Sequence, residues 1–150
     1  MLEGKTILLT GGTGSFGQKF AEIALGEQPK AIRIFSRGEL LQQQMSEKFG
    51  DNRLRFFIGD VRDKDRLYRA MVGADITVHA AALKQVPACE YNPVEAIQTN
   101  NNGAINVVNC AIEAKVSKVI AISSDKAVHP VNLYGMTKGV MEKLLVQANV

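Results

Sequence analysis

The chain of 150 residues is about one domain long, and its composition, with 46% hydrophobic and 22% charged residues, is that of an ordinary soluble globular protein rather than a disordered or fibrous one. A domain of this size buries roughly 70% of its unfolded surface, which is enough for a hydrophobic core. The net charge of +3 is small and its charged residues are scattered, so we expect no nucleic-acid partner.

Segments that would indicate secretion, membrane insertion or metal binding are not found in the sequence. The first residues do not have the pattern of a signal peptide, and no apolar stretch approaches the ~20 residues that a membrane span requires. Cys89 and Cys110 are far apart and no cluster of histidines or cysteines accompanies them. We therefore expect no metal site and a reduced, cytoplasmic setting.

Short aliphatic runs alternate with longer amphipathic stretches, which is the pattern of a parallel sheet wound with helices. Mostly apolar runs, typical of strands covered on both faces, predict strands at Lys5–Thr10, Ala31–Ser36, Leu54–Ile58, Ile76–Ala80 and Lys118–Ser123. The stretches between and after them predict helices at Ser15–Leu25, Glu39–Phe49, Asp63–Met71, Val94–Ala114 and Tyr134–Asn149. Asp63 is a typical capping residue, and Pro93 stands where a first helical turn tolerates proline.

The predicted fold class is α/β, a doubly wound, Rossmann-like parallel sheet formed by one domain, residues 1–150. Right-handed crossovers and a glycine-rich loop after the first strand predict the strand order 3-2-1-4-5. This order puts the switch point between the first and fourth strands. We expect a ligand at the carboxyl ends of the strands there.

The glycine-rich loop Gly11-Gly12-Thr13-Gly14-Ser15-Phe16-Gly17 follows the first strand and opens a helix, so its N–H groups can face a pyrophosphate. Gly11 would permit the tight turn, Gly14 would let the chain approach the phosphates, and Gly17 would let the helix pack closely. A plain glycine turn is the alternative. The position between strand and helix favours the dinucleotide site.

The second strand ends in Phe35-Ser36-Arg37. An acid at this point would accept hydrogen bonds from the ribose of NAD, whereas an arginine can pair with the extra phosphate of NADP. Alternatively, Ser36 and Glu39 form an S-x-x-E capping box and Arg37 is merely solvated. The two interpretations are compatible, so a capping box would not prevent Arg37 from pairing with the phosphate. We therefore favour NADP over NAD.

A tyrosine and a lysine four residues apart, Tyr134 and Lys138, would share one face of the last helix. A nearby ammonium stabilises a phenolate, so Tyr134 could act as a base near neutral pH. The other two tyrosines lack such a lysine, and a surface pair without consequence is the alternative here. His79 has no partner motif and is interpreted as a packed histidine.

Ser124, Tyr134 and Lys138 together resemble the Ser/Thr-Tyr-Lys triad of the extended short-chain dehydrogenase/reductases. The string SSDKAVHPVNLYGMTK resembles the inverting UDP-N-acetylglucosamine 4,6-dehydratases of polysaccharide biosynthesis and flagellin glycosylation. The strings FFIGDVRDKDRL, HAAALKQVPACEYNPVEAIQTN and SRGELLQQQM agree, so the resemblance covers essentially the whole chain. It is specific because Asp125-Lys126 stands where retaining sugar dehydratases carry an Asp-Glu pair.

The resemblance implies a bacterial enzyme of surface-glycan precursor synthesis that oxidises the sugar at C4, eliminates water across C5 and C6, and returns the hydride to C6. Tyr134, assisted by Lys138 and Ser124, would take the C4 hydroxyl proton, Lys126 would be the base at C5 and Asp125 the acid at C6. Lys126 would need burial or a neighbouring cation for this role, and the alternative for the pair is a solvated turn. Lys84 and Ser124 would also meet the UDP-sugar substrate.

The same resemblance implies which residues hold the cofactor. They are Gly11, Thr13, Gly14, Ser15, Phe16, Gly17, Ser36, Arg37, Asp60, Val61, Ala80, Ala81, Ala82, Lys84, Thr99, Tyr134 and Lys138.

Members of this group are longer, with further sheet strands and a smaller lobe that grips the nucleotide-sugar. We therefore expect this chain to lack that lobe, as a fragment or truncated product, and to leave apolar surface exposed unless another chain covers it. A homo-oligomer is expected. Two other functions stay open: a UDP-sugar 4-epimerase or reductase of the same fold, which needs Tyr134 and Lys138 but not Asp125-Lys126, and an NADP-binding module without catalysis.

Overall fold

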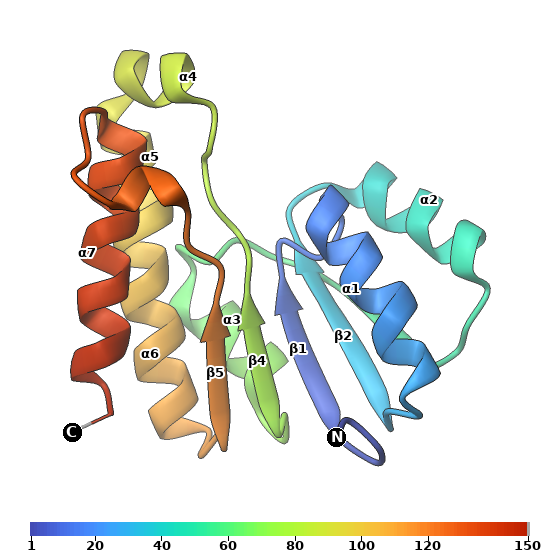
Figure 1. Cartoon of the computed structure of the whole chain (residues 1–150). Coiled ribbons are helices and arrows are strands. Elements are labelled where there is room, and N and C mark those ends of the chain that lie inside the picture. The colour runs from blue at the N-terminus through green and yellow to red at the C-terminus, as the bar shows by residue number, and fades with distance from the viewer. Residues whose placement is uncertain (150) are drawn as a thin grey trace.

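A five-stranded parallel sheet in the order β3-β2-β1-β4-β5 forms the centre of the computed structural model, which describes residues 1–149 (Figure 1). The strands are β1 Thr6–Thr10, β2 Ala31–Ser36, β3 Leu54–Ile58, β4 Ile76–His79 and β5 Lys118–Ala121. Their order confirms the predicted topology. In register, Thr10 lies beside Phe35 of β2 and beside His79 of β4, so the carboxyl ends of the three central strands meet at one edge.

Helices cover both faces of the sheet. They are α1 Ser15–Gly26, α2 Glu39–Phe49, α3 Lys64–Met71, α4 Val86–Tyr91, α5 Pro93–Ile97, α6 Gly103–Glu113 and α7 Leu133–Gln147, with a π-helical turn η1 at Gln98–Asn102 and a 3₁₀ turn η2 at Asp125–Ala127. Of the helices that the structure describes, none is both long and apolar enough to cross a membrane.

Side chains that alternate along β1 divide the core into two layers. Ile7 and Leu9 pack with the apolar faces of α1 and α2, whereas Leu8 packs with those of α3 and α6. Figure 1 shows the two helix layers on opposite sides of the sheet. Because all five residues of β1 are buried, the loop that follows this strand starts from a fixed point.

The predicted strands agree with the structure to within two residues at each end, and β2, β3 and α2 agree at both ends. The last strand is shorter than expected because it ends at Ala121, and it is half exposed, so it does not have two covered faces. Asp63 caps α3 through a hydrogen bond from the Arg66 amide, and Pro93 begins α5, both as predicted.

The predicted single helix Val94–Ala114 is divided into α5, η1 and α6. The chain gains one residue per turn at η1, where three consecutive asparagines precede Gly103. The spacing of hydrophobic residues indicates an amphipathic helix but does not distinguish a single π-helical turn within it. The sequence pattern therefore did not predict η1. The short elements α4 and η2 were also not predicted.

Candidate active site

The glycine loop after β1 packs closely against neighbouring backbone. Gly11 has a positive φ of 68°, and a Cβ on it would lie 2.7 Å from the Ala81 amide nitrogen. A Cβ on Gly17 would lie 2.4 Å from the carbonyl oxygen of Gly12. Gly11 therefore permits the turn and brings β1 beside the segment after β4, and Gly17 lets α1 start tightly against the loop.

The amino end of α1 presents free N–H groups at the same edge. Its N-cap is Gly14, which has no side chain to cap the helix. The first backbone hydrogen bond of the helix runs from Gln18 N to Gly14 O at 2.9 Å. Within residues 1–149, the amides of Ser15, Phe16 and Gly17 have no hydrogen-bond acceptor. Such an end, with its positive dipole, suits a pyrophosphate.

A groove of about 380 Å³ lies beside this loop, along the carboxyl ends of the strands. Twelve of the predicted cofactor residues line it: Gly11, Thr13, Gly14, Ser36, Arg37, Asp60, Val61, Ala80, Ala81, Ala82, Lys84 and Thr99. Ser15, Phe16, Gly17, Tyr134 and Lys138 do not line it. The groove is also lined by four residues that were not predicted as site residues: Phe35, Gly38, Leu41 and Gly59. Three of them adjoin a predicted residue in sequence, and Leu41 belongs to α2.

The hydroxyl of Thr99 supports a polar ligand in the groove. Thr99 is buried and lies at the groove wall, yet its Oγ1 has no hydrogen-bond partner among the described residues. Buried hydroxyls without a partner are uncommon, and a ligand atom is one explanation. The uncapped helix, the Gly11 approach and this hydroxyl together fit a dinucleotide.

Charged side chains occupy the end of the groove beside β2. Nη1 of Arg37 lies 3.8 Å from Oδ2 of Asp60, while Arg62 makes a shorter contact of 2.8 Å with the same oxygen. Partial burial acts to raise the pKa of Asp60, but the hydrogen bonds and charge of Arg62 outweigh it, so the pKa is lowered. Arg37 is more than half exposed and only loosely held, which leaves its guanidinium available to an anion.

The capping box that was the alternative for Ser36 and Glu39 is not formed. The N-cap of α2 is Gly38, without a side-chain hydrogen bond, and Ser36 still belongs to β2. The Ser36 hydroxyl instead accepts a hydrogen bond of 3.0 Å from Gln42 Nε2, which also donates to the Ser36 carbonyl. Gln42 thus fixes the backbone at the end of β2, beside the groove.

His79 is buried at the end of β4, in agreement with its interpretation as a packed histidine. Its Nδ1 lies 2.8 Å from Thr10 Oγ1, which also accepts from the Ala81 amide at 3.3 Å. Burial, with the charge of Lys138 nearby, lowers the pKa of His79 to about 3. The ring is therefore neutral and supports the backbone of the groove wall.

Tyr134 and Lys138 lie one turn apart in α7, and both are buried. Asn132 caps this helix by accepting from the Gly135 amide at 2.9 Å, which fixes where the helix begins. The Lys138 ammonium donates to the Ile122 carbonyl at 2.7 Å, so α7 is tied to the end of β5. Burial lowers the pKa of Lys138 to about 8, although Glu142 acts in the opposite direction.

Asp125 and Lys126 belong to the turn η2 between β5 and α7, and Ser124 is the N-cap of this turn. Oδ1 of Asp125 accepts from the Ser124 hydroxyl at 3.0 Å and from the Lys126 amide at 2.9 Å. The Asp125 side chain is 88% exposed and that of Lys126 48%, with the ammonium 3.5 Å from the carboxylate. The hydrogen bond from Ser124 and the charge of Lys126 lower the pKa of Asp125, so this carboxyl is ionised at neutral pH.

The Lys126 side chain is not buried, and its ammonium lies beside a carboxylate. The exposure of Asp125 and Lys126 corresponds to the solvated turn that was the alternative for this pair.

Asn100 and Asn101 in η1 connect the groove to α7, and the sequence analysis did not find them. Asn100 accepts from the Leu83 amide at 2.8 Å and donates to the Leu83 carbonyl and to Thr137 Oγ1, both at 2.9 Å. Asn101 donates to the Thr137 carbonyl at 2.9 Å. Three asparagines before a glycine in an otherwise helical stretch were the available signal, because asparagine is a poor helix former.

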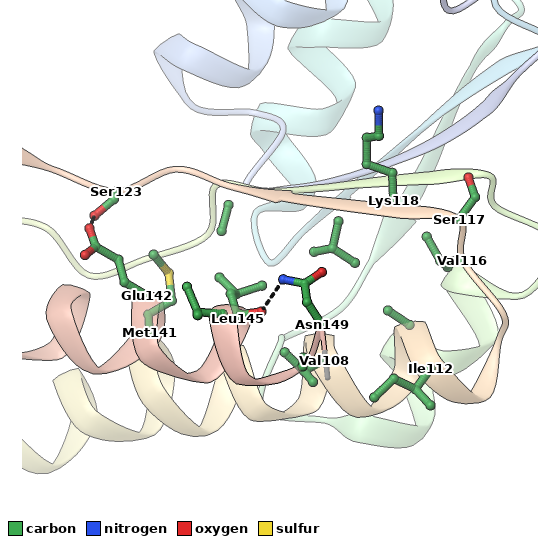
Figure 2. A pocket seen from close by; sticks show the side chains of 15 residues that line it. Val108, Ile112, Val116, Ser117, Lys118, Ser123, Met141, Glu142, Leu145 and Asn149 are labelled. Carbon is green, nitrogen blue, oxygen red and sulfur yellow. Dashed lines mark hydrogen bonds between the residues drawn. The ribbon is translucent and has the colours of Figure 1, made fainter.

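A larger hollow, of about 640 Å³, lies between the free edge of β5 and the ends of α6 and α7 (Figure 2). Its walls are mostly aliphatic, for example Ile112 and Leu145, and Ser123 and Glu142 point toward one another at one end. Of the predicted site residues, none lines it. It is a feature of the sheet edge and separate from the groove beside the glycine loop.

Residues 1–149 contain no group of three or more His, Cys, Asp or Glu side chains placed to hold a metal ion.

The strand order, the glycine loop and the Tyr-Lys helix define a Rossmann-like domain of the short-chain dehydrogenase/reductase type. Residues 7–150 match the model of the polysaccharide biosynthesis protein family. The chain belongs to this family.

Several curated relatives of the chain are named as enzymes of nucleotide-sugars. The chain is 54% identical to an inverting UDP-N-acetylglucosamine 4,6-dehydratase of Campylobacter jejuni, over 99% of this chain and 45% of that protein. It is 50% identical to a UDP-glucose 4-epimerase of Rickettsia canadensis, over 97% of this chain and 44% of that protein. The chain thus spans less than half the length of these relatives.

Solved structures give the same fold. Pen from Bacillus thuringiensis superposes with a TM-score of 0.96 at 44% identity, over 99% of this chain and 46% of Pen. WbmG from Bordetella bronchiseptica, solved in complex with NAD, superposes with a TM-score of 0.85 at 23% identity, over 99% of this chain and 51% of WbmG. At that lower identity the likeness concerns the fold alone.

Proposed function

We propose that the chain is the dinucleotide-binding part of an inverting UDP-N-acetylglucosamine 4,6-dehydratase that uses NADP. The observation that carries the proposal is the position of the Asp125-Lys126 turn, which is packed against the Tyr134–Lys138 helix. The 54% identity to a relative of that name supports it. Residues 1–150 would form one domain, and a lobe outside this chain would grip the UDP-sugar.

The dinucleotide would lie in the groove with its pyrophosphate at the amino end of α1, on the amides of Ser15, Phe16 and Gly17. Asp60 and Val61 would border its adenine, and Ala80 to Ala82 would let the backbone pass beside it. Thr99 and Lys84 would meet its other end. When bound, the cofactor accepts a hydride from the sugar and later returns it.

Tyr134 would take the proton of the C4 hydroxyl. A buried lysine whose pKa is about 8 is still mostly protonated at pH 7, so Lys138 can stabilise the phenolate that Tyr134 needs. Ser124 would assist by hydrogen bonding to the same hydroxyl, after releasing the bond that it now donates to Asp125. The resulting ketone acidifies the C5 proton.

For the elimination, Lys126 would remove the C5 proton and Asp125 would protonate the C6 hydroxyl as it leaves as water. Both roles require that substrate covers η2, because Asp125 is ionised and Lys126 half exposed in the free chain. Removal of water from a carboxylate raises its pKa, and removal of water from an ammonium lowers its own. Substrate binding would thus prepare both groups.

Arg37 supports NADP over NAD. Its guanidinium stands at the ribose end of the groove, is weakly engaged with Asp60, and could pair with a 2′-phosphate. No acidic side chain ends β2, where one would bind the ribose hydroxyls of NAD.

A UDP-sugar 4-epimerase is the second candidate, favoured by the 50% identity to a relative of that name. It needs Tyr134 and Lys138 but no elimination. Lys126→Ala separates the two candidates, since a dehydratase should lose water elimination and an epimerase should be little affected. A cofactor-binding module without turnover is the third, and it would bind NADP without forming either product.

The direct experiment is incubation of the purified chain, alone and extended to the length of its relatives, with UDP-N-acetylglucosamine and NADP. We expect a 4-keto-6-deoxy sugar from the extended protein. Formation of the C4 epimer without loss of water would identify an epimerase. NADP binding without either product from the extended protein would leave a binding module and contradict the proposal.

A further inference from the structure

Gly135 is a glycine inside a helix whose backbone conformation does not require one. It lies in the first turn of α7, directly after Tyr134, and its φ is not positive. Glycine within a helix costs about 1 kcal/mol relative to alanine. A local reason must therefore compensate for it.

The reason is steric. A Cβ on Gly135 would lie 2.0 Å from the carbonyl oxygen of Lys126 and 2.9 Å from its carbonyl carbon. Both atoms belong to the backbone, so no side-chain rotation could relieve the overlap. The Cβ of Pro130 is a third neighbour, 3.1 Å from the position of the added Cβ.

Of the two elements in contact, α7 is the more firmly held. Thr137 is bonded to both Asn100 and Asn101, and Lys138 to the Ile122 carbonyl, and these α7 side chains are buried. The turn η2 has exposed side chains and is held by short-range bonds, such as those from Ala127 N to Ser124 O and from Val128 N to Asp125 O. An added methyl group would therefore displace η2 rather than α7.

We infer that Gly135 is a positioning residue: its missing Cβ sets the separation between Tyr134 and the Asp125-Lys126 turn. This inference rests on the proposed function, in which Tyr134 acts at C4 and the turn acts at C5 and C6. Gly135 then couples the oxidation to the elimination. A larger residue at position 135 would leave Tyr134 in place and move the Asp125-Lys126 turn away from it.

The same helix supplies a matched control. Gly139 lies one turn further along α7, and the nearest atom to a Cβ on it would be the Ala127 carbonyl oxygen at 3.7 Å, an ordinary contact. Gly135→Ala and Gly139→Ala add the same atoms and remove the same helix-interior glycine penalty. Only the former requires the turn to move, by about 1 Å if the 2.0 Å contact is to open to 3.0 Å.

The first test measures the position of the turn without reference to catalysis. In heteronuclear NMR of the chain, Gly135→Ala should shift the amide resonances of Lys126, Ala127 and Val128, and Gly139→Ala should leave them nearly unchanged. NADP affinity should be the same in both variants. Unchanged turn resonances in Gly135→Ala, or equal changes in both variants, would overturn the inference.

The second test separates the two half-reactions in the protein extended to the length of its relatives. With UDP-N-acetylglucosamine, Gly135→Ala should still give reduced nicotinamide at a rate within tenfold of the parent protein, while 4-keto-6-deoxy product falls on the order of 100-fold, the effect of a ~1 Å misplacement. Gly139→Ala should change neither. An equal fall in both steps would overturn the inference.

Two further outcomes are informative. If Gly135→Ala does not fold, the double variant Gly135→Ala/Pro130→Gly removes the second short contact and loosens the segment between η2 and α7, so that the turn can shift; it should fold, bind NADP and lack elimination. Normal elimination in that double variant would overturn the inference. If the parent protein gives no 4-keto-6-deoxy product, the proposed function fails, whereas the NMR test of the turn still decides the role of Gly135.

Discussion

The carboxamide of Asn100 donates to Thr137 Oγ1 at 2.9 Å and so joins the π-helical turn η1 to the helix that carries Tyr134 and Lys138. The same carboxamide binds both backbone groups of Leu83, next to the groove residue Lys84. One 2% exposed side chain therefore holds the cofactor groove and the Tyr-Lys helix in a fixed relation. The stability of the chain should therefore depend on the amide donor of Asn100.

Asn100→Asp should destabilise the chain by about 3 kcal/mol. The carboxylate keeps an acceptor for the Leu83 amide but loses the hydrogen bonds to Leu83 O and Thr137 Oγ1, each of which contributes about 0.5–1.5 kcal/mol. Burial of the new carboxylate adds a desolvation cost. Asn109→Asp, at an exposed position of α6, is the control and should be nearly neutral. Urea unfolding measures both. Equal stabilities of the two variants would show that the bonds of Asn100 contribute little.

Gly11→Ala should abolish dinucleotide binding. The substitution combines a positive φ with a Cβ 2.7 Å from the Ala81 amide nitrogen, so the loop and the groove wall must separate. Gly50→Ala is a matched control because Gly50 also has a positive φ, 56°, but its Cβ would meet open space. It should cost only about 1–2 kcal/mol of stability and leave NADP affinity intact. NADP titration of both variants decides; retained affinity in Gly11→Ala would place the cofactor elsewhere.

Arg37→Ala should weaken NADP binding about 10- to 100-fold and leave NAD binding nearly unchanged. A charge-assisted contact to a phosphate contributes about 1.5–3 kcal/mol, and NAD lacks the phosphate. Arg55→Ala, at an exposed position of β3, serves as the control. Titration calorimetry with both cofactors measures the difference. A parallel loss of NAD affinity would mean that Arg37 only shapes the groove.

Lys138 should make the chain more stable as pH rises above 8. Its pKa falls from 10.5 to about 8 in the fold because the side chain is buried. Between these values the unfolded chain binds more protons than the folded one, so the free energy of unfolding increases with pH through this window, by at most about 3 kcal/mol. Below pH 8 the full cost of the buried ammonium is present.

The comparison with Lys138→Met isolates this effect. The difference in free energy of unfolding between parent and variant, measured in urea at pH 7.5 and pH 10 as rough limits of the window, should move in favour of the parent at the higher pH. A difference that is the same at both pH values would mean that Lys138 titrates near its ordinary value in the fold.

Sequence patterns predicted the sheet and its loop well because both follow from local rules. Apolar runs specify buried strands such as β1, and a glycine loop between strand and helix predicts the turn at Gly11 and the start of α1 after Gly14. The groove residues followed because parallel strands bring their carboxyl ends together, so Arg37, Asp60 and Ala81 lie near one another despite their distance in sequence.

What the sequence did not predict depends on contacts between distant segments. The π-helical turn at Asn100 is stabilised by bonds to Leu83 and Thr137, which no periodicity reports. The capping box failed because Ser36 remains in β2 and bonds to Gln42. The exposure of β5 reflects its position at the sheet edge, which composition alone does not give.

A crystal structure of the chain with NADP is the decisive test of the proposed cofactor site. We expect a pyrophosphate within hydrogen-bond distance of the amides at the start of α1, beginning at Ser15, and a nicotinamide that faces the Tyr134 hydroxyl. A pyrophosphate remote from Gly14, or a nicotinamide turned away from Tyr134, would contradict it.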